Sequence, residues 1–148
     1  MTTHEIIAEL PYGKSFLFVD ELLHVDENSA RGTYTYAETL SFYKDHFIGL
    51  PVTPAVVLTE TMAQIGVVCL GVYLLKNMTV KEKFSMAMTS NAIEFLRPVY
   101  PGEKVIVSSE KIYFRFNKLS CKVKMENADG DTICKGNISG MLIFKSNG

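Results

Sequence analysis

The pattern of hydrophobic and polar residues sets one long apolar segment apart from the rest of the chain. Residues 54–75 carry a single charged side chain, Glu60, and are apolar on every side of a helical projection. In a soluble protein such a helix is surrounded by other elements. A membrane span needs about 20 apolar residues, and the uncharged part after Glu60 is shorter and contains Gln64. The pattern therefore predicts a buried central helix and no membrane span.

Strands are predicted on both sides of this helix. Residues that favour strands, with period-two alternation in places, fill the segments 16–25, 30–36, 84–96, 105–116, 119–127 and 132–144, and short helical turns are predicted at 4–9 and 40–43. The triplet Asp129-Gly130-Asp131 is a hairpin signal. We expect an α+β fold of one domain over residues 1–148, in which a curved antiparallel sheet of about six strands wraps the helix. Its exposed edges favour a dimer.

One face assignment and one cysteine pair follow from these segments. In segment 105–116, one face is predicted to hold Ile112, Phe114 and Phe116, and the other Lys111, Tyr113 and Arg115. Cys121 and Cys134 lie on neighbouring predicted strands and could face each other, although buried core thiols are the commoner explanation.

The composition excludes several classes of function. With 15 basic and 16 acidic residues, the formal net charge is -1, which favours neither nucleic acid nor an anionic membrane surface as a partner. The three cysteines and three histidines are scattered, so no metal site is expected. The odd cysteine count and the lack of an apolar core in the first ten residues indicate a reducing, cytoplasmic location.

Glu60 is the first candidate for chemistry, because burying a carboxylate on so apolar a helix is costly. Gln64 lies one turn later on the same face and is placed to hydrogen-bond the carboxyl group. Burial would raise the pKa of Glu60 and suit a general acid. The alternative is a glutamate at the helix periphery that reaches solvent or an arginine of a partner.

His46 is the second candidate, and it lies among aromatic residues. A base would need a neutral imidazole and a partner for the other ring nitrogen. Asp45 is adjacent in sequence, but neighbouring side chains usually point apart. A purely structural histidine is the commoner explanation of such a position.

The start of the helix is the third candidate. Thr53 is a suitable N-cap and Pro54 a favoured first residue, which leaves the amides of Ala55 and Val56 free to bind an oxyanion. An ordinary capped helix is the alternative, and the Thr53 hydroxyl could itself occupy one of these amides. A basic rim for an acidic partner is conceivable from dispersed cations, although solvated faces explain them more often: Lys76, Lys81, Lys83, Arg97 and Lys104.

Together these residues resemble the 3-hydroxyacyl-[acyl-carrier-protein] dehydratase family of hotdog-fold proteins. The family pattern H-F-x-G-x-P-V-x-P-G aligns with His46 to Ala55, where Ala55 takes the place of the final glycine, and the helix motif of a glutamate followed by Ala-Gln is matched from Glu60 to Gln64. Weaker matches occur at residues 10–20, at 95–103 and at the Asp129-Gly130 pair.

The resemblance implies a lyase that removes water from 3-hydroxyacyl thioesters on acyl-carrier protein and forms trans-2-enoyl thioesters, without a cofactor. It implies homodimers, in some cases trimers of dimers, with His46 of one subunit as base and Glu60 of the other as acid. Ala55 or Val56 would supply the oxyanion donor and Gln64 would orient the acid. An apolar tunnel would hold the acyl chain, and its candidate liners, which flexible core packing explains as well, are Phe47, Met62, Phe84, Met86 and Met88.

Three positions depart from the family pattern, and they suggest a specialised branch. Asp45 and Ala55 replace glycines, and Thr53 stands where methionine is common. We therefore expect a role in fatty-acid synthesis or in a polyketide- or aryl-polyene-type pathway. The rival functions are a hotdog acyl thioesterase, which would not need the His46 motif, and a non-catalytic subunit that binds acyl-carrier protein.

Overall fold

The computed structural model describes residues 1–76 and 84–144. Helix α1 (Thr3–Ala8) begins at an N-cap formed by Thr2, whose side chain accepts a hydrogen bond from Glu5 in a capping box. The central helix comprises α2 (Ala55–Ala63), a π-helical turn η3 (Gln64–Val68) and α3 (Cys69–Leu75). Two short 3₁₀ helices, η1 (Lys14–Phe16) and η2 (Ser41–Lys44), lie in the connections before them.

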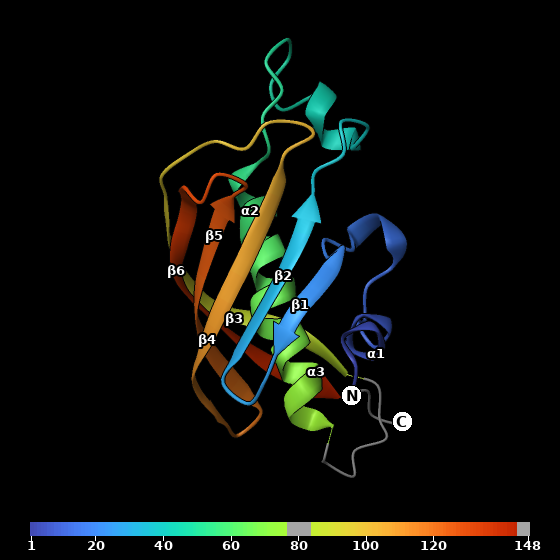
Figure 1. The fold of residues 1–148 in the computed structure, drawn as a ribbon, viewed down its shortest axis with the longest axis vertical. Coiled ribbons are helices and arrows are strands. Elements are labelled where there is room, and N and C mark those ends of the chain that lie inside the picture. The colour runs from blue at the N-terminus through green and yellow to red at the C-terminus, as the bar shows by residue number, and fades with distance from the viewer. Residues whose placement is uncertain (77–83, 145–148) are drawn as a thin grey trace.

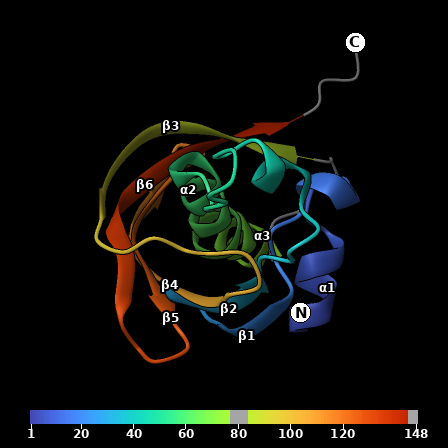
Figure 2. The same ribbon diagram turned by 90° about the horizontal axis from the view of Figure 1, so that it is seen from above.

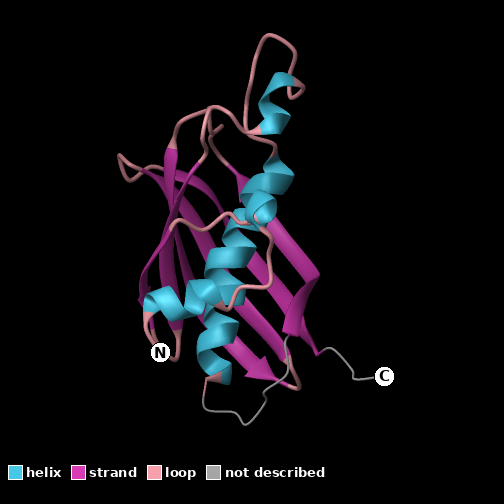
Figure 3. Cartoon of the chain, turned by 90° about the vertical axis from the view of Figure 1, so that its right-hand side faces the viewer, coloured by secondary structure: helices cyan, strands magenta, loops and turns pink. Residues whose placement is uncertain are grey.

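Six strands form one antiparallel sheet in the order β1-β2-β4-β5-β6-β3. Their bounds are β1 (Glu21–Val25), β2 (Ser29–Thr35), β3 (Phe84–Phe95), β4 (Lys104–Arg115), β5 (Lys118–Asn127) and β6 (Thr132–Phe144). Figure 2 shows the sheet curling round the helix, with α1 beside β1. The helix runs along the concave face of the sheet (Figures 1 and 3). This is the expected hotdog fold, and β1 and β3 are its edges.

The core lies between the helix and the concave face of the sheet. The helix contributes fully buried residues such as Met62, Ile65 and Leu70, and the strands contribute Val105, Val107, Leu119, Val123, Met125 and Ile138. The window of highest hydropathy in residues 55–75 is 72% buried inside the protein, as expected for a core helix. The three cysteines are free and buried. Cys121 lies opposite Ile138 and Cys134 opposite Met125, so the two thiols do not face each other.

The predicted strand over residues 16–25 is wrong in its first half. Strand β1 begins at Glu21, and the backbone at Phe16 and Phe18 before it hydrogen-bonds with a side chain instead of a neighbouring strand. The Phe18 amide donates to Gln64 Oε1 at 2.8 Å, and the Phe16 carbonyl accepts from Gln64 Nε2 at 2.9 Å. A side chain nearly fifty residues away thus holds this segment against the helix.

The predicted alternation at the end of β4 is also wrong. A bulge between Lys111 and Tyr113 shifts the register with β5, and Ile112 is exposed while Phe114 packs against the core. Phe116 leaves the strand altogether, with a φ of 51°, and forms the turn with Asn117, whose φ is 61°.

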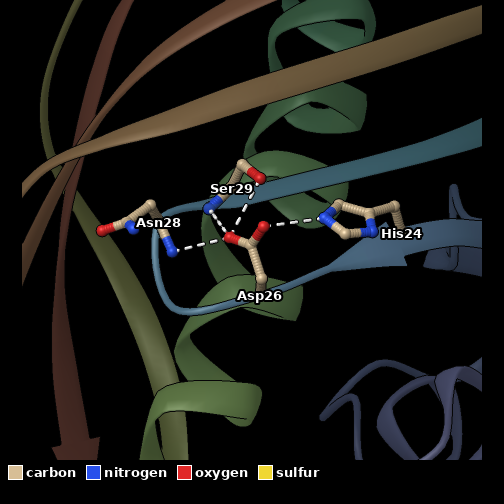
Figure 4. Close-up of polar contacts among 4 residues, drawn as sticks. All are labelled: His24, Asp26, Asn28 and Ser29. Carbon is tan, nitrogen blue, oxygen red and sulfur yellow. Dashed lines mark hydrogen bonds and ion pairs between the residues drawn. The ribbon is translucent and has the colours of Figure 1, made fainter.

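The β1–β2 turn is held by one carboxylate (Figure 4). Asp26 accepts hydrogen bonds from the amides of Asn28 and Ser29 and from the Ser29 hydroxyl, and it pairs with His24 Nε2 at 2.8 Å. These contacts hold the pKa of the Asp26 carboxyl group well below its ordinary value, and the contact with His24 has the largest effect.

Candidate active site

Helix α2 begins without a side-chain cap. Its N-cap is Pro54, which forms no side-chain hydrogen bond, so the prediction of Thr53 as N-cap and Pro54 as first helical residue is wrong. The Thr53 hydroxyl is instead engaged with the Tyr43 hydroxyl at 2.6 Å, and the Thr53 amide donates to the Val99 carbonyl at 2.8 Å. Thr53 therefore does not occupy the first-turn amides. Those of Ala55 and Val56 lie at the exposed start of the central helix.

Glu60 lies on α2, where its side chain is half-buried. Burial raises the pKa of its carboxyl group above the ordinary value, and a hydrogen bond from Gln64 opposes this shift in part. Gln64 Nε2 donates to Glu60 Oε2 at 3.3 Å, which is the contact expected from their spacing. A carboxyl group that tends to keep its proton in this way can serve as an acid.

The orientation of the Gln64 amide is determined by the backbone around it. Gln64 is fully buried. Its Oε1 must accept from the Phe18 amide and its Nε2 must donate to the Phe16 carbonyl, because these backbone groups have fixed roles. The second hydrogen of Nε2 then remains for Glu60. The segment before β1 thus positions the carboxyl group through Gln64, a link the sequence pattern did not indicate.

His46 lies on the loop between η2 and α2, which projects from the end of the molecule where the central helix begins (Figure 1). Its Nδ1 is 2.9 Å from the Val52 carbonyl oxygen. A carbonyl can only accept, so Nδ1 carries a hydrogen and Nε2 is the basic nitrogen of the neutral ring. The Val52 amide in turn donates to the His46 carbonyl at 2.9 Å.

The partner of the imidazole is therefore a backbone group, which side-chain patterns cannot reveal. Asp45, the acidic neighbour in sequence, is exposed, and within residues 1–76 and 84–144 it forms no hydrogen bond with the ring. The Phe47 ring stacks on the imidazole instead, with centroids 4.3 Å apart.

Two hollows lie along the central helix, and they contain different candidates. The first is an open hollow of about 300 Å³ at the helix start, lined by Thr53, Ala55, Leu58, Phe95, Leu96, Arg97 and Pro98. The second is a more enclosed cavity of about 40 Å³ beside Glu60. His46 lines neither of them, and in the described part of the chain no hydrogen bond or ion pair joins His46 to Glu60. One chain brings Glu60 and Gln64 together but leaves His46 apart.

The predicted tunnel residues also separate. Met86 and Met88 line the cavity beside Glu60. Met62 is wholly buried, with its sulfur 3.7 Å from Cys134 Sγ, and Phe84 packs against the core with its ring 6.4 Å from that of Phe144. Phe47 is 58% exposed. These three residues line neither hollow.

Tyr12 is a residue of the cavity that the sequence did not single out. It lines the same hollow as Glu60. Burial is the main cause that raises the pKa of its phenol, and Glu60 adds to the shift when its carboxyl group is ionised, so the hydroxyl keeps its proton. It adds a second hydrogen-bond donor to the surroundings of the carboxyl group.

The predicted basic residues do not form one cluster. Lys76 lies 3.3 Å above the Tyr73 ring and pairs with Glu27 at 3.4 Å, whereas Arg97 lines the open hollow. Lys104 is exposed on β4, and Lys81 and Lys83 lie outside the described residues. No group of three or more potential metal ligands is found among the residues that the structure describes.

Comparison with known proteins identifies the family. The model of the FabA-like domain matches residues 10–139, which is most of the chain. The chain belongs to the FabA-like family. This FabA-like protein is 31% identical to the 3-hydroxyacyl-[acyl-carrier-protein] dehydratase FabZ of Herpetosiphon aurantiacus, over 97% of this chain and 99% of that protein. It is 33% identical to FabZ of Fusobacterium nucleatum, over 84% and 86% of the two chains.

Solved structures show the same fold at low sequence identity. The dehydratase heterocomplex ApeI:P from Xenorhabdus doucetiae matches the FabA-like chain with a TM-score of 0.78 and 12% identity, over 99% of this chain and 93% of that one. A hypothetical thioesterase from Streptococcus pneumoniae, solved with coenzyme A, matches with a TM-score of 0.60 and 10% identity, over 86% and 88%.

Proposed function

We propose that this protein is a 3-hydroxyacyl-[acyl-carrier-protein] dehydratase, a lyase that converts 3-hydroxyacyl thioesters to trans-2-enoyl thioesters. The observation that carries the proposal is the different environment of its two candidates. The Val52 carbonyl engages Nδ1 of His46 and leaves Nε2 available to act as a base, and burial favours the protonated carboxyl group of Glu60. The names of the FabZ relatives support the same reaction.

Each group then has one task in the reaction. Nε2 of His46 removes a proton from the α-carbon of the substrate, and the electron pair of that bond forms the new double bond. The Glu60 carboxyl group donates its proton to the β-hydroxyl, which leaves as water. An amide of Ala55 or Val56 would stabilise the negative charge on the thioester oxygen, because first-turn amides and the helix dipole favour anions. Transfer of the proton from His46 to Glu60 restores both groups, and no redox step or cofactor is involved.

A homodimer is the assembly that completes this site. In one chain the helix start and the Glu60 cavity are separate hollows. Apolar side chains are exposed on the His46 loop and at the helix start, namely Phe47, Ile48, Leu50 and Val56. The long edge strand β3 exposes Met88 and Phe95. An unpaired edge beside an exposed apolar patch is suited to pairing with a second copy. His46 of one subunit would then meet Glu60 of its partner, and a trimer of such dimers is the proposed larger assembly.

The thioester end of the substrate belongs in the open hollow. Ala55, whose amide is one of the proposed oxyanion donors, lines this hollow, and Arg97 offers a cation to an anionic phosphopantetheine arm. Arg97 Nη2 is 3.9 Å from Asp131 Oδ1, and the Arg97 side chain is half-exposed, so its guanidinium group remains accessible to a ligand. Acyl-carrier protein is the proposed partner, and the cytoplasm is the proposed location.

The pathway is proposed as fatty-acid synthesis or a polyketide- or aryl-polyene-type route. The departures at Asp45, Thr53 and Ala55 motivate the second, and the ApeI:P dehydratase shares the fold. Comparing saturated with aryl or polyunsaturated carrier-bound substrates distinguishes them, and faster turnover of the saturated substrates would favour the fatty-acid route.

A thioesterase is the alternative that the structural similarity to a coenzyme A-bound thioesterase raises. Absorbance near the enoyl-thioester band, followed with a 3-hydroxyacyl thioester, distinguishes the two reactions. We expect the enoyl product to form and no free thiol to appear. Free thiol without enoyl product would establish a thioesterase. Unchanged substrate at every chain length, with binding of acyl-carrier protein retained, would establish a non-catalytic subunit.

A further inference from the structure

The cavity beside Glu60 is small for an acyl pocket. Its volume is about 40 Å³, whereas an engineered protein cavity that binds benzene measures about 150 Å³. Besides Glu60, the cavity is lined by Tyr12 and by residues of the central helix and of strands β3 and β6, namely Ala63, Val67, Val68, Met86, Met88, Ile138, Ser139 and Gly140. Such a space accommodates a short aliphatic group next to the carboxyl group.

An apolar stripe continues from this cavity along the helix. Ala63 and Val67 follow Glu60 on one side of the helix, and Gly71 is the next residue at this spacing. A Cβ built on Gly71 would lie 3.8 Å from Leu119 and 3.9 Å from Leu142, both of which are buried. The space over Gly71 is therefore apolar and filled by neighbouring side chains, so a longer chain could extend there only if one of them moved.

Met86 is the side chain that fills this space most closely. A Cβ built on Gly71 would lie 3.0 Å from Met86 Cε, and one built on Gly140 would lie 2.6 Å from its Sδ and 2.7 Å from its Cγ. The thioether thus fills the space that two missing side chains leave on the helix and on β6. Met86 is only half-buried and packs against the core, and methionine adapts readily to irregular gaps.

We propose that Met86, seated between Gly71 and Gly140, closes the acyl pocket beside Glu60 and restricts the enzyme to short 3-hydroxyacyl chains. This inference rests on the proposed dehydratase function. It names Met86 as the residue that sets the chain length, and it places short aliphatic chains ahead of aryl and polyene chains.

The first test measures binding, so that it does not depend on turnover. Amide analogues of 3-hydroxyacyl pantetheine with four to ten acyl carbons are titrated into the intact protein by calorimetry. For the wild type we expect the affinity to stop rising, or to fall, beyond about six carbons. Met86→Ala removes the Cγ, Sδ and Cε atoms, so the next few methylenes should each raise the affinity by about fourfold, the gain for burying a methylene group. Met141→Ala is the matched control, because Met141 is exposed on β6 and lines no described pocket.

The second test reverses the change. Gly140→Ala should force Met86 toward the cavity and weaken binding of the six-carbon analogue. The double variant with Met86→Ala should bind this analogue as the wild type does. Melting temperatures check that both variants are folded. The inference is overturned if the wild type binds the ten-carbon analogue with the full methylene gain, or if Met86→Ala keeps the wild-type length profile. Should binding follow our expectation while no enoyl thioester forms, the pocket assignment holds and the dehydratase function fails.

Discussion

His46 and Glu60 obtain their chemistry from opposite surroundings. His46 lies on an exposed loop, and a backbone carbonyl holds one ring nitrogen so that the other is basic. Glu60 lies on the core helix, and burial raises the pKa of its carboxyl group. The base therefore depends on hydrogen-bond geometry and the acid on desolvation. In the proposed site, the exposed loop of one subunit supplies the base and the buried helix of the other supplies the acid.

The strongest test of this difference separates the two steps of the reaction. Removing either group should lower kcat by about 10²- to 10⁴-fold, the usual contribution of a general acid or base. Glu60→Gln should still exchange the α-hydrogen of the substrate with deuterium from solvent, because His46 remains, whereas His46→Ala should lose exchange and dehydration together. Mass spectrometry of the recovered substrate measures this. If His46→Ala exchanged the α-hydrogen of the substrate at the wild-type rate, His46 would not be the base.

The hydrogen bonds of Gln64, which position the Glu60 carboxyl group, can be removed without changing Glu60 itself. Gln64→Leu leaves the buried Phe18 amide and the part-buried Phe16 carbonyl without their partner. It should lower the free energy of unfolding by at least about 1–3 kcal/mol, the cost of one unpaired buried group. Urea denaturation measures the loss. Thr59→Val on the same helix is the control and should change stability by about 0.5 kcal/mol or less. An equal effect of both variants would contradict the role of Gln64.

The pH dependence of stability tests the burial of Glu60. Its pKa is raised from the ordinary 4.5, so the folded protein keeps a proton that the unfolded chain has released. The stability contributed by this group is therefore present at low pH and is lost as the pH rises from 4.5 through the folded pKa. Glu60→Gln removes the effect, and its melting temperature relative to wild type should increase as the pH rises over this window. A constant difference would show that burial does not favour the protonated form.

The smallest effect is expected at Asp45. Because the Val52 carbonyl orients the imidazole, Asp45→Asn removes an exposed charge that the ring does not contact. Such charges contribute little, and kcat/KM should change by less than about threefold. A loss comparable to that of His46→Ala would make Asp45 the partner of the base.

Local patterns predicted most of the fold, because periodicity and turn residues decide it. Strand β6 has the predicted bounds, and the helix ends at Leu75 as expected. The errors arise where distant groups replace local partners. Gln64 takes the backbone bonds of residues 16–18, and the Tyr43 hydroxyl takes the Thr53 side chain from the helix start.

The sequence points to the residue types of the candidate site, whose roles stay predictions, but not to their geometry. The spacing of Glu60 and Gln64 led to their hydrogen bond, because four residues make one helical turn. The Val52 carbonyl beside His46 is a backbone group, and the seat of Met86 between Gly71 and Gly140 joins three separate elements. Neither arrangement has a signature in a local window of sequence.

Mixing two inactive subunits tests the shared site most directly. His46→Ala and Glu60→Gln proteins are combined in equal amounts, allowed to exchange subunits, and assayed for enoyl-thioester formation. In a symmetric dimer with shared sites, half of the dimers are mixed and each has one intact site, so about a quarter of the wild-type activity should return. If both groups acted within one chain, no mixture would contain an intact site. Activity that stays at the level of the separate variants, although mass spectrometry shows mixed dimers, would contradict the account.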